Sequence, residues 1–158
     1  MRPIATLSFD LEALSKAMQL TENEVRAYFT DGRRVSFVIE RRISREVMLG
    51  QLASTEGAPF DLVAEDGTKW EVRSLTRQGM YFCPSYMVGS GRVFEEKGFL
   101  QKLEGIDGYL IAHVDEFPNI EVWRVSSNTV LSWYRSGRLG TSTKISAVKA
   151  LDLLVHGA

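Results

Sequence analysis

Apolar residues recur at intervals of three and four positions in the first third of the chain, which is the spacing of one face of an α-helix. Residues 8–20 and 21–32 both show this period. Thr21 is followed three residues later by Glu24, the pattern of a capping box at a helix start. The pattern therefore predicts two short helices, the second of which stops at Gly32.

A third helical segment lies between residues 33 and 52. Its apolar residues are spaced by four positions, and most of its arginines lie off that apolar line. The segment is therefore predicted to be an amphipathic helix with a basic flank. The apolar residues are Val35, Ile39, Ile43 and Val47, and the basic flank contains Arg33, Arg34, Arg41, Arg42 and Arg45.

The hydrophobic period changes to two after Pro59, as expected of β-strands. Residues 60–64 and 69–76 flank Asp66-Gly67, a strong hairpin signal. Beyond a long irregular connection, the pattern predicts a helix at 94–106, strands at 107–114 and 120–125, and a helix at 146–155. This order of elements favours an α/β or α+β fold, in which helices flank a mixed central β-sheet.

Composition narrows the class of protein. The chain has 158 residues, of which 44% are hydrophobic, and this fits one globular domain. Its 19 Lys and Arg against 20 Asp and Glu give no overall basic excess, so any contact with nucleic acid depends on a local patch. One cysteine, no secretory segment and no apolar run long enough for a membrane span predict a cytoplasmic protein without a membrane partner.

The predicted hairpin gathers charged side chains. Alternation along a strand places Lys69, Glu71 and Arg73 on one face, and Asp61 on the partner strand is expected near Glu71. Two carboxylates with one backbone carbonyl are oxygen ligands of the kind that Mg²⁺ prefers. The alternative is an ordinary solvated strand face with alternating charges.

The run Pro59, Asp61 and Glu71-Val72-Arg73 resembles the signature of the PD-(D/E)xK nucleases, a superfamily that includes type II restriction endonucleases. The resemblance implies a restriction-endonuclease-like core at residues 34–125, preceded by N-terminal helices (1–33) and followed by a C-terminal segment (126–158). It also implies that Asp61, Glu71 and the Val72 backbone carbonyl bind Mg²⁺, for which Mn²⁺ can substitute. The implied partners are double-stranded DNA and a second copy of the chain in a homodimer.

One position departs from that signature, because Arg73 stands where the family has lysine. An arginine stays charged, so it can stabilise negative charge but cannot act as a general base. Three readings stay open: Arg73 supplies the catalytic cation, Lys69 supplies it, or the chain binds DNA without cleaving it.

Several further residues are candidates for contact with the DNA backbone. A Gly-Ser-Gly-Arg turn precedes the helix at 94–106 and resembles an anion-binding helix start. Glu40 or Glu46 of the third helix could add a carboxylate to the metal site. The predicted DNA contacts are Ser74, Arg77, Ser90, Arg92, Arg41 and Arg42.

The predicted function is thus Mg²⁺-dependent hydrolysis of DNA phosphodiester bonds by an endonuclease most like a small type II restriction enzyme. Two alternatives remain open. One is a non-catalytic domain of the same fold that binds nucleic acid or a protein partner, and the other is a phage or repair nuclease.

Overall fold

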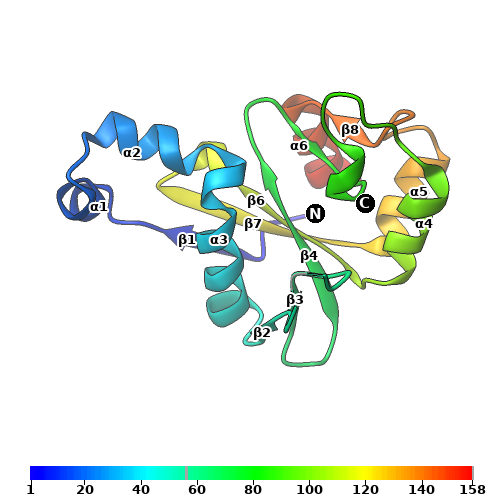
Figure 1. Ribbon diagram of the computed structural model, residues 1–158, viewed down its shortest axis with the longest axis horizontal. Coiled ribbons are helices and arrows are strands. Elements are labelled where there is room, and N and C mark those ends of the chain that lie inside the picture. Colours follow the sequence, from blue (N-terminus) through cyan, green and yellow to red (C-terminus); the bar gives the residue numbers. More distant parts are fainter. Residues whose placement is uncertain (56, 158) are drawn as a thin grey trace.

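A six-stranded mixed β-sheet forms the centre of the computed structural model, which describes residues 1–55 and 57–157 (Figure 1). The strand order is β1-β7-β6-β4-β3-β2, in which β4 and β6 are parallel and the other neighbours are antiparallel. The predicted mixed central sheet is confirmed. Its strands are β1 (Ala5–Ser8), β2 (Gln51–Leu52), β3 (Leu62–Val63), β4 (Lys69–Leu75), β6 (Gly108–His113) and β7 (Asn119–Ser126).

Helices cover both faces of this sheet. The helices are α1 (Leu11–Met18), α2 (Glu22–Phe29), α3 (Gly32–Arg42), α4 (Glu96–Glu104), α5 (Ser127–Arg135) and α6 (Ala147–His156). Residues of α1, α2 and α3 belong to one apolar core, and residues of α4, α5 and α6 belong to a second. A small antiparallel sheet of β5 (Met80–Tyr81) and β8 (Lys144–Ile145) adjoins the second core.

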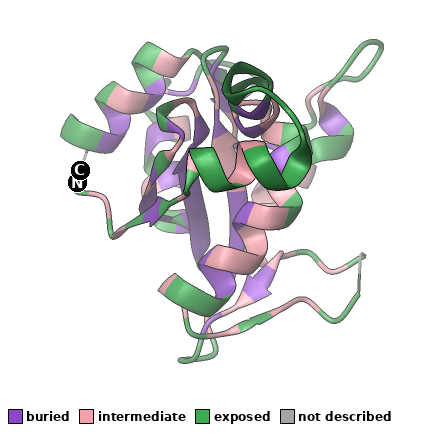
Figure 2. Ribbon diagram, turned by 90° about the vertical axis from the view of Figure 1, so that its left-hand side faces the viewer, coloured by how far each residue is buried: buried purple, intermediate pink, exposed green. Residues whose placement is uncertain are grey.

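Strand β4 contributes to both cores because its side chains alternate between the two faces of the sheet. Trp70 and Val72 pack in the core of α1 to α3, whereas Leu75 packs in the core of α4 to α6. Glu71 and Arg73 share the face of Leu75, so two charged side chains point toward the second core. Figure 2 shows the strands of the sheet largely buried and the outer surfaces of the helices exposed.

The second half of β4 has no strand beside it on the β3 side within the described part of the chain, because β3 pairs only with Trp70 and Lys69. The start of α3 approaches that edge instead. A Cβ built on Gly32 would lie 2.8 Å from the Ser74 Cβ, so only glycine fits there. The Ser74 hydroxyl also donates a hydrogen bond to the Gly32 carbonyl at 3.3 Å.

The predicted capping box and hairpin turn are confirmed, whereas two predicted helix boundaries are wrong. Thr21 and Glu24 form the predicted capping box, and Gly67 has the positive φ of a hairpin turn. The third helix is shorter than predicted, since α3 ends at Arg42 and passes into a π-helical turn, Ile43–Val47. Gly32 does not end a helix but begins α3, because the Asp31 side chain caps the free N–H groups there.

Several elements were not predicted, among them β1, β2, β5, β8 and α5. β1 has four residues, of which only Leu7 is fully buried, so its alternation is too short to detect. α5 is capped by Ser126 and buries Val130 and Trp133, which is a weak helical period within a polar segment.

Among the described residues, none of the helices is both long and apolar enough to cross a membrane.

Candidate functional site

Asp61 lies where the β3–β4 pairing ends, one position beyond the Leu62–Trp70 pair. The β3–β4 register pairs Leu62 with Trp70, and the Asp61 amide donates to the Trp70 carbonyl at 3.0 Å, so Asp61 is the next residue opposite Glu71. The Asp61 Oδ2 atom then accepts a hydrogen bond from the Val72 amide at 2.7 Å. The side chain of Asp61 thus continues the ladder where β3 ends, which fixes its carboxylate at the open edge of β4.

Glu71 is buried and bound by two cations. Its Oε1 atom lies 2.6 Å from Arg73 Nη1, and its Oε2 atom contacts the ammonium of Lys102 on α4. The side chains of Glu71, Arg73 and Lys102 are only 8%, 12% and 12% exposed. A solvated strand face is therefore wrong for Glu71 and Arg73, although Lys69 at the start of the strand is exposed.

The guanidinium of Arg73 is held in place by several groups. Besides Glu71, its Nη2 atom donates to the Cys83 carbonyl at 3.3 Å, and its Cζ atom lies 5.0 Å from the centre of the Tyr81 ring. Its Nε atom is buried and has no hydrogen-bond partner among the described residues. Lys69 makes no such contact with Glu71; its ammonium lies 5.3 Å from the centre of the Phe60 ring.

Two carboxyl groups at this site are harder to ionise than usual. Burial is the main cause that raises the pKa of Asp61, and the charge of Glu71 raises it further against the opposing effects of the Val72 amide, Arg73 and Lys102. On α3, burial and then the charge of Asp61 raise the pKa of Glu40 to about 7. A cation placed beside Asp61 and Glu40 would relieve this repulsion.

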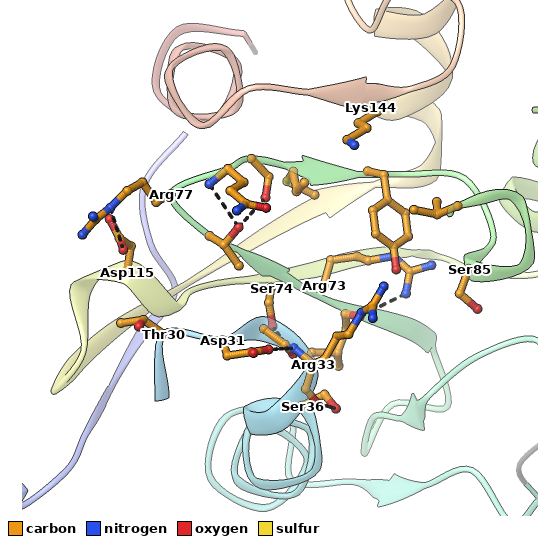
Figure 3. Close-up of a pocket in the computed structure, with 18 of the residues that line it drawn as sticks. Thr30, Asp31, Arg33, Ser36, Arg73, Ser74, Arg77, Ser85, Asp115 and Lys144 are labelled. Atoms are coloured by element: carbon orange, nitrogen blue, oxygen red, sulfur yellow. Dashed lines mark hydrogen bonds and ion pairs between the residues drawn. The ribbon is translucent and has the colours of Figure 1, made fainter. Parts of the chain in front are cut away.

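A cleft of about 1220 Å³ opens along the free edge of β4, between α3 on one side and β5 with β8 on the other (Figure 3). Glu40, Asp61 and Val72 line it. Figure 3 shows Arg33 of α3 and Lys144 of β8 on opposite walls. Small-molecule sites usually occupy roughly 300 to 1,000 Å³, so a cleft of this size can also take part of a polymer.

Some predicted DNA-contact residues line the cleft and others do not. Ser74, Arg77 and Arg92 are part of its lining, but the Arg92 guanidinium donates to the carbonyls of Ser85 and Val88 in its own loop. Arg77 is exposed and lies 3.8 Å from Asp115. Ser90 is exposed in the same loop as Arg92 and is not part of the lining.

The two third-helix arginines predicted to contact DNA, Arg41 and Arg42, are engaged elsewhere. Arg42 makes a two-pronged ion pair with Glu46 at 2.7 Å and donates to the Ser8 carbonyl, whereas Arg41 stacks 3.3 Å from the centre of the Phe37 ring. Glu46 is therefore neutralised by Arg42. Of the two helical carboxylates considered, only Glu40 lines the cleft.

The residues present fit a hard divalent cation in their chemistry. Asp61, Glu71 and the Val72 carbonyl offer oxygen donors, and one or two carboxylates are the usual protein share of a Mg²⁺ site. In the described part of the chain, no three His, Cys, Asp or Glu side chains are grouped closely enough to hold an ion. Glu71 also has both oxygens bound by cations, so it must exchange one of them for a metal ion.

Lys102 and Lys144 are site residues that sequence reasoning missed. Lys102 lies 31 positions beyond Glu71, and its ammonium also donates to the Pro59 carbonyl at 2.6 Å. A weak signal exists, because Lys102 follows the buried Phe99 by three residues and so lies toward the buried face of α4. Nothing in the local pattern marks Lys144.

Comparison with known proteins adds no identification. No protein-family model matches the chain, and no curated protein matches its sequence. The case for a function therefore depends on the geometry of the site.

Proposed function

We propose that this protein is a Mg²⁺-dependent endonuclease that hydrolyses phosphodiester bonds in double-stranded DNA, with a restriction-endonuclease-like core and a homodimeric assembly. The observation that supports this most is the position of Asp61. Its carboxylate lies opposite Glu71 and beside Val72 at the open edge of β4, next to a cleft with cations on both walls. Acidic groups that bind a metal ion and basic groups that bind phosphates are both needed for this reaction.

Each residue has a distinct task in the proposed reaction. Asp61, Glu71 and the Val72 carbonyl hold the ion, and Mn²⁺ can replace Mg²⁺ with the same oxygen donors. When bound, the ion acts as a Lewis acid on the phosphate and lowers the pKa of a bound water. Arg73 stabilises negative charge that develops on the phosphate, because it stays protonated at any working pH.

The cations of the cleft walls suit a polyanion. Arg33 and Lys144 are exposed and form no ion pair among the described residues, so both are free to meet phosphates. The net charge of −1 gives the protein no overall attraction for DNA, and these cations supply a local attraction instead.

The test is cleavage of supercoiled plasmid and of labelled duplex oligonucleotides with Mg²⁺, with Mn²⁺ and with a chelator. Asp61→Asn should abolish metal-dependent cleavage, whereas Lys97→Met, a change at an exposed position on α4, should leave it unaltered. Equal cleavage by wild type and Asp61→Asn would refute the site. Mismatched and branched duplexes in the same assay separate a restriction enzyme from a repair or phage nuclease.

A second candidate function is a non-catalytic domain that binds nucleic acid or a protein partner. The specific observation in its favour is the double ion pair of Glu71, since a carboxylate held by Arg73 and Lys102 is less available to a metal ion. In that case duplex DNA should bind equally well with and without Ca²⁺ and should stay intact. Tighter binding in Ca²⁺ favours the nuclease.

A further inference from the structure

The Glu71 carboxylate forms ion pairs with cations from two different elements. Arg73 comes from the same strand, whereas Lys102 comes from α4 on the face of the sheet that the second core covers. A single carboxylate with two buried cationic partners is an unusual arrangement, because buried charges are costly unless each is compensated.

Three cationic side chains are candidates for holding the Glu71 carboxylate in place. Lys69 is exposed and its ammonium lies beside the Phe60 ring, so it does not hold Glu71. Arg73 is fixed between Glu71, Cys83 and Tyr81. Lys102 is the one lysine among the described residues whose ammonium contacts Glu71.

Lys102 also connects the two halves of the candidate site. Its ammonium donates to the Pro59 carbonyl at 2.6 Å, and Pro59 lies two residues before Asp61. One ammonium therefore restrains both Glu71 and the backbone that leads to Asp61. The helix that presents it is firmly anchored, since the neighbouring Phe99 and Leu103 are buried in the second core.

We propose that Lys102 is a positioning residue, whose ammonium sets the separation of Asp61 and Glu71 by binding the Glu71 carboxylate and the Pro59 carbonyl together. This inference rests on the ion-binding part of the proposed function, because the two carboxylates matter only if they bind an ion. Neither Lys102 nor Glu71 is among the residues that line the cleft, and the Lys102 ammonium contacts Glu71, so Lys102 acts through Glu71 and not on the phosphate.

Lys102→Met tests the proposal because methionine keeps the length of the side chain and removes its charge. Loss of an outer partner of a metal ligand typically costs about 10-fold to 100-fold in metal affinity or activity. The loss of a positive charge by itself would instead strengthen binding of a divalent cation. A weaker affinity for the ion in Lys102→Met therefore indicates positioning, and a stronger affinity indicates simple charge repulsion.

Calorimetric titration with Ca²⁺ gives a readout independent of cleavage. Folding is first checked by circular dichroism. We expect Lys102→Met to weaken Ca²⁺ binding by about 10-fold to 100-fold, Lys102→Arg to recover part of the loss, and Lys97→Met on the same helix to match wild type. Wild-type or tighter binding by Lys102→Met, or no Ca²⁺ binding by the wild type, would overturn the inference.

A second measurement covers the case in which Lys102→Met does not fold. Lysine ammonium groups observed by ¹H–¹⁵N NMR in the wild type report the Lys102 contact directly, and Ca²⁺ should shift the Lys102 signal but not that of the exposed Lys97. An unmoved Lys102 signal at saturating Ca²⁺ contradicts the proposal. If Ca²⁺ binds and shifts the Lys102 signal but Mg²⁺ supports no cleavage of any duplex, the nuclease function fails and the positioning role stands.

Discussion

Replacing Glu71 by glutamine should destabilise the protein strongly, because two buried cations would lose their shared anion. The substitution preserves the shape of the side chain, so it creates no cavity and tests the charge alone. Arg73 and Lys102 each expose only 12% of their side chains and cannot regain full hydration without local rearrangement. The carboxylate itself is 8% exposed, so little of the interaction is screened by solvent.

The expected loss in the free energy of unfolding is about 3 kcal/mol. Removal of one partner from a buried ion pair usually costs about 3 to 5 kcal/mol, because an uncompensated charge stays behind. The lower end applies here because the amide oxygen of glutamine still accepts a hydrogen bond from one of the two cations.

Urea unfolding followed by tryptophan fluorescence measures the effect, with Glu104→Gln on the exposed surface of α4 as the matched control. The control should differ from wild type by less than about 0.5 kcal/mol. Adding Lys102→Met to Glu71→Gln should cost less than Lys102→Met alone, since the ammonium has already lost its partner. A loss below about 1 kcal/mol for Glu71→Gln would refute the reasoning about buried charge.

Three further predictions follow from the electrostatics of the cleft. The pKa of Glu40 is raised to about 7 in the folded protein, so the protonated carboxyl stabilises the fold below pH 4.5 and this contribution is lost as the pH rises to about 7. Glu40→Gln should remove that decline in the free energy of unfolding, measured by urea titrations at several pH values. Arg33→Ala and Lys144→Ala should each reduce the salt slope of duplex binding by about 0.9, measured by fluorescence anisotropy, and Lys149→Ala on the exposed surface should not. Arg73→Ala should lower any cleavage rate by about 10²-fold to 10³-fold in gel assays, and an unchanged rate would remove Arg73 from the reaction.

The hairpin was the part of the site that sequence could predict, because its geometry is local. Alternation and the Asp66-Gly67 turn fix which residues oppose each other, and this is enough to bring Asp61 to Glu71. The same rule placed Glu71 and Arg73 on one face. It did not reveal that this face is buried, since burial depends on where α4 and the loop before it pack.

Contacts between distant segments were beyond the sequence pattern. Lys102 meets Glu71 because β4 and β6 pair in parallel and α4 connects them across the face of the sheet. Parallel strands are not joined by a tight turn, so the sequence contains no turn residues from which their register could be predicted. The cleft likewise depends on how closely α3 approaches β4, where Gly32 lies against Ser74 and Thr76.

The charge balance of the site explains why an arginine at position 73 is compatible with a second cation from α4. Glu40, Asp61 and Glu71 together have three negative charges when ionised, and Arg73 with Lys102 has two positive charges. In the absence of an ion, protonation of Glu40 removes the remaining negative charge below about pH 7, since Glu40 has a pKa of about 7. A divalent cation would let Glu40 ionise and leave the group with one positive charge, which suits the approach of a phosphate. With a lysine at position 73 the count would be the same, so the substitution changes the geometry of the cation and its ability to exchange protons, not the balance of charge.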